Sequence, residues 1–182
     1  RAKTTTDGPA EVAIGLGGNV GSPELAFGRA LEGLAARVGR LAVSPLYVTA
    51  PVDGPPQPDF LNAAATFRTS LSPLELLALL RRLETEAGRE RLGERYGPRP
   101  LDLDILLYGG LEIDLPGLVI PHPRLAERRF VLAPLADLVP DLVVPGTGRT
   151  VASLLASAPE ARVERRRTPK DRASGRPVAA GR

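Results

Sequence analysis

Two aspartates interrupt an otherwise apolar, strand-like segment, GPRPLDLDILLYGG, at residues 97–110. Asp102 and Asp104 alternate with leucine and isoleucine, although aspartate is depleted from β-strands. Side chains two positions apart on a strand point to the same face, roughly 7 Å apart at ~3.3 Å per residue. The alternation predicts a buried opposite face made of Leu101, Leu103, Ile105 and Leu107.

Two carboxylates at this separation suggest a specific chemistry. Each could anchor a hard cation, and phosphate oxygens could bridge two metals ~3.5–4 Å apart. The same pattern also fits a solvent-facing edge strand that carries two charges. The strand alone favours neither interpretation.

The loop before this strand is rich in arginine. Arg89, Arg91, Arg95 and Arg99 lie within eleven residues, interleaved with glycines. The planar guanidinium group suits phosphate oxygens, and glycine lets a loop change conformation. A cationic loop leading into a dicarboxylate strand therefore favours metal-dependent phosphoryl transfer over a merely solvated charged loop.

Three further groups of residues are candidates for a site. His122 lies between two prolines, six residues before Arg128, and these two side chains could together bind phosphate. Phe60 and Asn62 lie two apart, so they could stack on and hydrogen-bond a flat heterocycle, although core packing explains Phe60 equally well. The glycines of GLGGNVGS resemble a phosphate-binding loop only weakly, and a tight strand-to-helix turn explains them better.

Composition excludes several alternatives. Lysine occurs only at Lys3 and Lys170, which removes a Walker-type phosphate loop and a lysine Schiff base from the body of the chain. His122 is the sole histidine and there is no cysteine, so multi-histidine and thiolate zinc sites are excluded. No stretch approaches the ~20 apolar residues of a membrane span. We therefore expect a cytoplasmic protein.

The charge is unevenly distributed. Residues 160–182 carry eight basic and three acidic side chains, whereas residues 1–159 carry 16 basic and 18 acidic ones. We predict a flexible segment at 1–10, one domain at 11–158 and a disordered basic tail at 159–182. The tail could contact a polyanion weakly, but we expect its removal after Ala158 to leave activity intact.

The apolar periodicity predicts the elements. Strands are expected at 11–16, 40–49 (broken or bulged at Pro45, which favours an edge), 61–70 and 101–108, with one or two more within 111–120. Helices are expected to begin at Ser22 and Ser72, the latter with a capping box, and a helical stretch within 121–142. The order β-α-β-β-α-β predicts an α+β ferredoxin-like sandwich, a mostly antiparallel sheet with helices covering one face.

Three motifs in this order and spacing resemble one known family. PQPDFLNAA, GRERLGERYGPRPLDLDILLYG and IPHPRLAERRFVLAPLADLVPD look like 6-hydroxymethyl-7,8-dihydropterin pyrophosphokinase, over about Val12 to Leu142. The resemblance implies transfer of pyrophosphate from ATP to the hydroxymethyl group of the pterin in folate biosynthesis. Attack would fall on the β-phosphorus and release AMP. We expect a monomer acting on these two small molecules.

The resemblance also implies roles for residues. Asp102 and Asp104 would bind two Mg²⁺ ions and, with Arg89 and Arg99, lie nearest the chemistry. Contacts to ATP would come from Arg91, Arg95, Ile105, His122 and Arg128. The pterin would be bound by Thr49, Pro51, Val52, Phe60, Asn62, Tyr96 and Phe130. Glu84 matches another family position near the active site.

The chain departs from the family at three positions. Gly18 stands where serine is usual, and Gly117 and Val119 stand where some members use arginine and threonine towards ATP. These changes imply altered nucleotide affinity. Two rival functions remain: a non-enzymatic module that binds nucleic acid through its basic tail, and a catalytically weakened relative retained for a partner. The first leaves the aspartate pair without a role.

Overall fold

A computed structural model describes residues 8–51, 54–88 and 97–166. The main strands are β1 (Ala10–Gly18), β2 (Leu41–Val43), β3 (Tyr47–Thr49), β4 (Phe60–Thr69), β5 (Asp102–Tyr108) and β10 (Val163–Arg165). Two small hairpins pair β6 (Ile113–Leu115) with β7 (Leu118–Ile120), and β8 (Val143–Val144) with β9 (Arg149–Thr150). The helices are α1 (Pro23–Val38), α2 (Pro73–Glu86), η1 (Leu125–Glu127), α3 (Arg129–Ala136) and α4 (Val151–Ser157).

The six main strands form one antiparallel sheet in the order β10-β3-β4-β1-β5, with β2 also paired to β4. The predicted α+β class with an antiparallel sheet is confirmed. The expected break at Pro45 is also present, because β2 ends at Val43 and β3 begins at Tyr47. Among the described strands β2 pairs only with β4, so it lies at an edge as expected, whereas β3 pairs with both β4 and β10.

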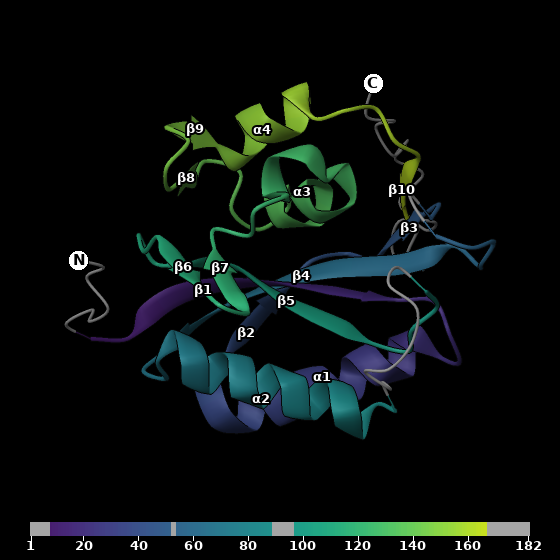
Figure 1. The fold of residues 1–182 in the computed structure, drawn as a ribbon, viewed down its shortest axis with the longest axis horizontal. Helices are drawn as coiled ribbons and strands as arrows, with labels where there is room; N and C mark the ends of the chain where they lie inside the picture. Colours follow the sequence, from purple (N-terminus) through teal and green to yellow (C-terminus); the bar gives the residue numbers. More distant parts are fainter. Residues whose placement is uncertain (1–7, 52–53, 89–96, 167–182) are drawn as a thin grey trace, which may run out of the picture.

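Helices cover both faces of this sheet, not one as the sequence suggested. Figure 1 shows α1 and α2 below the sheet, and α3 and α4 above it. Each layer has its own apolar core. Phe27, Leu34, Leu76 and Leu80 belong to the cluster under the sheet, whereas Leu132, Leu135, Val151 and Leu154 belong to the cluster above it. The second layer was missed because the 143–158 region, which holds α4, was given no element.

Local signals explain where the first two helices begin and end. Ser72 and Glu75 form the predicted capping box of α2, each side chain accepting from the other's backbone N–H. Ser22 is the N-cap of α1, without a side-chain capping bond. Gly39 adopts a φ of 84° where α1 ends, a conformation that glycine reaches without strain.

A β-bulge in β5 reverses which side of the sheet the side chains after Leu106 point to. The register pairs Ile14 with Ile105 but Ala13 with Leu107, so Leu106 is an extra residue. Leu101, Leu103 and Ile105 pack below the sheet as predicted, but Leu107 packs above it with Leu106. The prediction for Leu107 was wrong because strict alternation cannot reveal a bulge.

The start of the basic tail is ordered. Residues 163–165, predicted to be disordered, form β10 and pair with β3. Residues 1–7 and 167–182 lie outside the described residues, so the rest of the predicted flexible segments is not tested. No helix in the described ranges is long and apolar enough to cross a bilayer.

Candidate active site

A cavity of about 410 Å³ lies on the sheet face that carries α3. Its floor comes from β1, β4 and β5, and its sides come from the 122–131 segment, β3 and the 159–161 segment. The lining includes nine of the predicted site residues: Thr49, Phe60, Asn62, Arg99, Asp102, Asp104, His122, Arg128 and Phe130.

Two rows of paired residues organise the floor. In the first, Gly17 of β1 pairs with Asn62 on one side and with Asp102 on the other. In the second, Gly15 pairs with Ala64 and with Asp104. Neighbouring strands are ~4.8 Å apart, so Asn62 and Asp102 stand about 10 Å from each other across a glycine. A ligand can therefore lie on the sheet between the amide and the carboxylate.

These glycines do not have the role expected from the sequence. Gly15 and Gly17 lie inside β1 and line the cavity, so they do not form a turn. A Cβ atom at Gly17 would lie 3.2 Å from Oδ1 of Asn62, and one at Gly15 would lie 3.5 Å from the Leu106 side chain. Gly18 also belongs to β1, and a Cβ atom there would lie 2.5 Å from the carbonyl oxygen of Pro100. Only Gly21, with a φ of 67°, lies in the turn that precedes α1.

One end of the cavity, named the phosphate end for the predicted role of its residues, is defined by Arg99, Asp102, Asp104, His122 and Arg128. It holds four of the eight charged side chains in the lining. Arg99 donates a hydrogen bond from Nη1 to Oδ2 of Asp102 at 2.9 Å. The Arg99 Nε atom is buried and finds no acceptor in the described part of the chain. This guanidinium is thus held beside a carboxylate, and its buried Nε–H has no acceptor among the described residues.

Buried polar groups fix the backbone at this end. Glu84 of α2, only 5 % exposed, accepts a 2.7 Å hydrogen bond from the backbone N–H of Leu103, between the two aspartates. Asn19 exchanges two hydrogen bonds with the backbone of Arg99 and donates to Gln57 and Pro58. Glu84 does not line the cavity, so it positions β5 without reaching a ligand.

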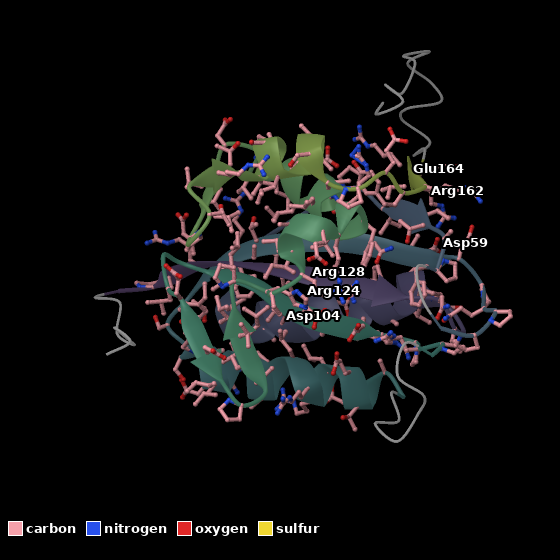
Figure 2. The ribbon with its side chains drawn as sticks, turned by 45° about the horizontal axis from the view of Figure 1, so that its top comes forward. Asp59, Asp104, Arg124, Arg128, Arg162 and Glu164 are labelled. Atoms are coloured by element: carbon pink, nitrogen blue, oxygen red, sulfur yellow. The ribbon has the colours of Figure 1, made fainter. Side chains whose placement is uncertain are left out.

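His122 lies over β5, and its backbone N–H donates to the carbonyl of Leu106 at 3.0 Å. Its Nδ1 accepts from the backbone N–H of Arg124, which leaves Nε2 3.5 Å from Nη1 of Arg128. Burial, and then the charge of Arg128, lowers the pKa of His122 to about 4. The ring is therefore neutral at pH 7, and with Nδ1 accepting, its Nε2–H is a donor beside a guanidinium. Figure 2 shows Arg124 and Arg128 near Asp104.

The acceptor end, defined here by Thr49, Phe60, Asn62 and Phe130, is uncharged. Asn62 donates from Nδ2 to Oγ1 of Thr49 at 2.7 Å, and both side chains are buried. Arg99 lies 5.9 Å from the ring centre of Phe60, and Arg128 lies 5.7 Å from that of Phe130. Two aromatic rings and a fixed amide–hydroxyl pair suit a flat heterocycle with polar edges.

Some predicted residues fall elsewhere. The Ile105 side chain packs in the core below the sheet, and Pro51 does not line the cavity. Gly117 and Val119 belong to the turn and second strand of the β6–β7 hairpin, also away from the lining. Five residues lie outside the described ranges: Val52, Arg89, Arg91, Arg95 and Tyr96.

Sequence reasoning also missed lining residues. Arg124 and Glu127, which form a 3.6 Å ion pair, flank the phosphate end; their place within the IPHPRLAERR motif was the available signal. Pro159, Glu160 and Ala161 were assigned to a disordered tail, and no local pattern marks them.

Comparison with known proteins agrees with this site. A family model for 7,8-dihydro-6-hydroxymethylpterin-pyrophosphokinase matches residues 13–140. The chain is 45 % identical over 156 residues to the 2-amino-4-hydroxy-6-hydroxymethyldihydropteridine pyrophosphokinase of Pseudomonas aeruginosa, covering 85 % of this chain and 95 % of that relative. It is 46 % identical over 127 residues to the enzyme of the same name from Bacillus subtilis, covering 69 % and 75 % of the two chains.

Longer relatives match over part of their length. The mitochondrial folate synthesis bifunctional protein of Arabidopsis thaliana is 53 % identical over 131 residues, which are 71 % of this chain and 23 % of that protein. The crystal structure of wild-type Plasmodium falciparum HPPK-DHPS superposes with a TM-score of 0.65 at 15 % identity, covering 85 % of this chain and 45 % of that one. That likeness concerns the fold alone. From the family model and the relatives together, this chain belongs to the 7,8-dihydro-6-hydroxymethylpterin-pyrophosphokinase family and is a pyrophosphokinase of folate biosynthesis.

Proposed function

We propose that this pyrophosphokinase binds the triphosphate of ATP at the phosphate end and the hydroxymethyl-dihydropterin at the acceptor end, and that it joins them over β1. One observation carries the proposal: Asn62, Gly17 and Asp102 form a continuous row across three strands. Gly17 places no side chain between the amide proposed to bind the ring and the carboxylate proposed to lie near the phosphates, and a Cβ atom there would crowd the Asn62 oxygen at 3.2 Å.

The bonds change in one displacement. The hydroxymethyl oxygen attacks the β-phosphorus, the bond between that phosphorus and the oxygen of the α-phosphate breaks, and AMP leaves with the bridging oxygen. The hydroxyl proton is released to solvent or to a phosphate oxygen. No strong base is required when the transition state is loose, because positioning and charge stabilisation dominate.

The side chains of the phosphate end suit this displacement. Arg128 and the Nε2–H of His122 face the same space and together offer donors to phosphate oxygens. The Nε of Arg99 has no acceptor in the described residues. We propose that this guanidinium stabilises the negative charge that develops on the transferred pyrophosphoryl group. Arg89, Arg91 and Arg95, outside the described ranges, are proposed to add to this charge from the preceding loop.

Asp102 and Asp104 are the residues that would hold Mg²⁺. They lie on one face of β5, in adjacent rows of the floor, and both line the cavity. The described residues contain no cluster of three or more histidine or carboxylate side chains suited to a metal, so phosphate oxygens and water would complete the octahedral shell. When bound, the ions neutralise the triphosphate and orient it for in-line attack.

The acceptor end would bind the pterin between Phe60 and Phe130. Asn62 and Thr49, fixed by their mutual hydrogen bond, keep further donor and acceptor capacity for the polar edge of the ring. Pro51 and Val52 are proposed to contribute backbone contacts, and Tyr96 to cover the ring. We also propose that the enzyme acts as a monomer.

Product analysis tests this function. The purified protein is mixed with ATP labelled on the γ-phosphate, the dihydropterin and Mg²⁺. We expect AMP and the pterin diphosphate in equal amounts, with the label in the pterin product. Release of ADP, or AMP without a labelled pterin, would contradict transfer of an intact pyrophosphoryl group.

A further inference from the structure

The segment from Pro159 to Arg166 connects α4 to the far side of the sheet and passes the mouth of the cavity. Pro159, Glu160 and Ala161 line the same cavity as Thr49, Phe60 and Asn62. Figure 1 shows the segment descending from α4 to β10 beside β3. A part of the chain without any recognisable motif thus forms part of the wall.

Backbone pairing fixes this segment to the acceptor end. In the β10–β3 ladder, Val163 is opposite Thr49, the hydroxyl that accepts from Asn62. The backbone N–H of Arg166 donates to the carbonyl of Leu46 at 2.8 Å, and its side chain pairs with Glu24 of α1. Without β10, the three-residue strand β3 would be an exposed edge.

An ion pair connects the same segment to the residue that precedes Phe60. Arg162 lies 3.9 Å from Asp59, the residue directly before Phe60, and donates to Glu164 at 2.9 Å. Figure 2 shows Asp59, Arg162 and Glu164 grouped away from the Asp104 cluster. Exposed ion pairs of this kind contribute little individually, so the strand pairing carries most of the attachment.

We propose that residues 159–166 form the outer wall of the acceptor end and set the affinity for the heterocyclic acceptor, not for the nucleotide. The inference rests on the proposed function. Charge decides which end the wall serves: Glu160 brings a carboxylate to the rim, which would repel a triphosphate but can accept from the amino and N–H groups on a pterin edge. This proposal predicts that removal after Ala158 impairs activity, the opposite of the expectation from the sequence.

A fluorescence experiment tests the wall without catalysis. The chain contains no tryptophan, so Ala161→Trp introduces a single reporter at the rim. Ala152→Trp, at an exposed position of α4 that does not line the cavity, is the matched control. The acceptor is added with Mg²⁺ and α,β-methylene-ATP, whose bridging bond cannot be cleaved. We expect emission to move to shorter wavelength in Ala161→Trp alone, because the bound ring excludes water from the indole.

Calorimetry on the unmodified chain separates the two proposals. If the unmodified chain binds the acceptor under these conditions but the emission of Ala161→Trp does not move, the proposal of an outer wall is wrong and the proposed function stands. If it binds no acceptor at all, the proposed function fails and the wall fails with it.

Steady-state kinetics provide the second test. Truncation after Ala158 should raise the acceptor KM about tenfold, with the ATP KM changed less than about twofold. A chain ending at Arg166 keeps β10 and should behave like the full chain. Arg162→Ala should raise the acceptor KM by only about two- to threefold, whereas Arg82→Ala, which removes an exposed ion pair on α2, should change neither KM. Equal changes in the KM for the acceptor and the KM for ATP would overturn the proposal. If the chain truncated after Ala158 does not fold, the Arg162→Ala and Ala161→Trp variants test the proposal in its place.

Discussion

The two ends of the cavity are built in different ways. The phosphate end rests on β5, which pairs with β1 from Asp102 to Tyr108 and is supported by the buried Glu84. The acceptor end rests partly on β3 and β10, each three residues long, and on an exposed ion pair at 3.9 Å. The first is fixed by long pairing and buried polar contacts, the second by short strands brought together from distant parts of the chain.

This difference suggests that the phosphate end determines mainly the rate of turnover and the acceptor end mainly the affinity for the acceptor. The groups that stabilise developing charge must stay within a fraction of an ångström of their positions, so a rigid support favours turnover. A heterocycle gains most of its affinity from stacking and edge hydrogen bonds, which tolerate a softer wall. Changes at the phosphate end should therefore appear in kcat, and changes at the acceptor end in the acceptor KM.

Removing a carboxylate at the phosphate end should have the largest effect. Asp104→Asn keeps the shape of the side chain but loses the charge that we propose holds a metal, so kcat should fall by at least about a hundredfold. The folding midpoint should change little, because the side chain is partly exposed at a cavity. Asp114→Asn, at an exposed position of β6, is the control. Wild-type turnover in both Asp104→Asn and Asp102→Asn would exclude the two-metal assignment.

Arg99 offers a sharper test of the same end. Arg99→Ala removes a guanidinium that pairs with Asp102 and should lower kcat about 10- to 100-fold while the acceptor KM changes little. Mg²⁺ should reach half-maximal effect at a lower concentration in this variant, because a cation that competes for Asp102 is gone. A defect confined to KM would show that Arg99 binds substrate equally in ground and transition states.

The two ends also differ in how far the sequence predicts them. Asp102, Asp104 and Arg99 lie in one short segment, so the period of a strand was enough to place both carboxylates on one face. His122 and Arg128 were found for the same reason, since both belong to one local motif.

Other features depend on contacts between distant segments. The bulge at Leu106 arises only when β5 pairs with β1, and no residue type marks it. The 159–166 segment looks like a basic tail by composition, yet β10 exists because β3, more than a hundred residues earlier, offers it an unpaired edge. The close approach of Pro100 to Gly18 is likewise a tertiary contact, because a Cβ atom at Gly18 would lie 2.5 Å from the carbonyl oxygen of Pro100.

At the acceptor end, Asn62→Ala should raise the acceptor KM about tenfold with a smaller change in kcat. It should also lower the free energy of unfolding by about 1–3 kcal/mol, because the buried Thr49 hydroxyl loses its donor. Steady-state kinetics and denaturant titration give the two values. If Asn62→Ala lowered kcat as much as Arg99→Ala does, the two ends would not differ in whether they affect kcat or the acceptor KM.

The smallest expected effect is on the pH dependence of stability without nucleotide or metal. The pKa of His122 is about 4 in the folded chain, lowered by burial, Arg128 and Arg124 against the opposing charge of Asp102, and near 6.5 in an unfolded chain. Below pH 6.5 the unfolded chain therefore takes up a proton that the folded chain excludes, and stability falls as the pH drops towards 4. His122 is the only histidine of the chain, so its replacement isolates the contribution of the phosphate end. His122→Gln should flatten the decline between pH 7 and pH 5 in denaturant titrations, before carboxylates contribute; identical slopes in the two proteins would mean that the imidazole is not held neutral beside Arg128.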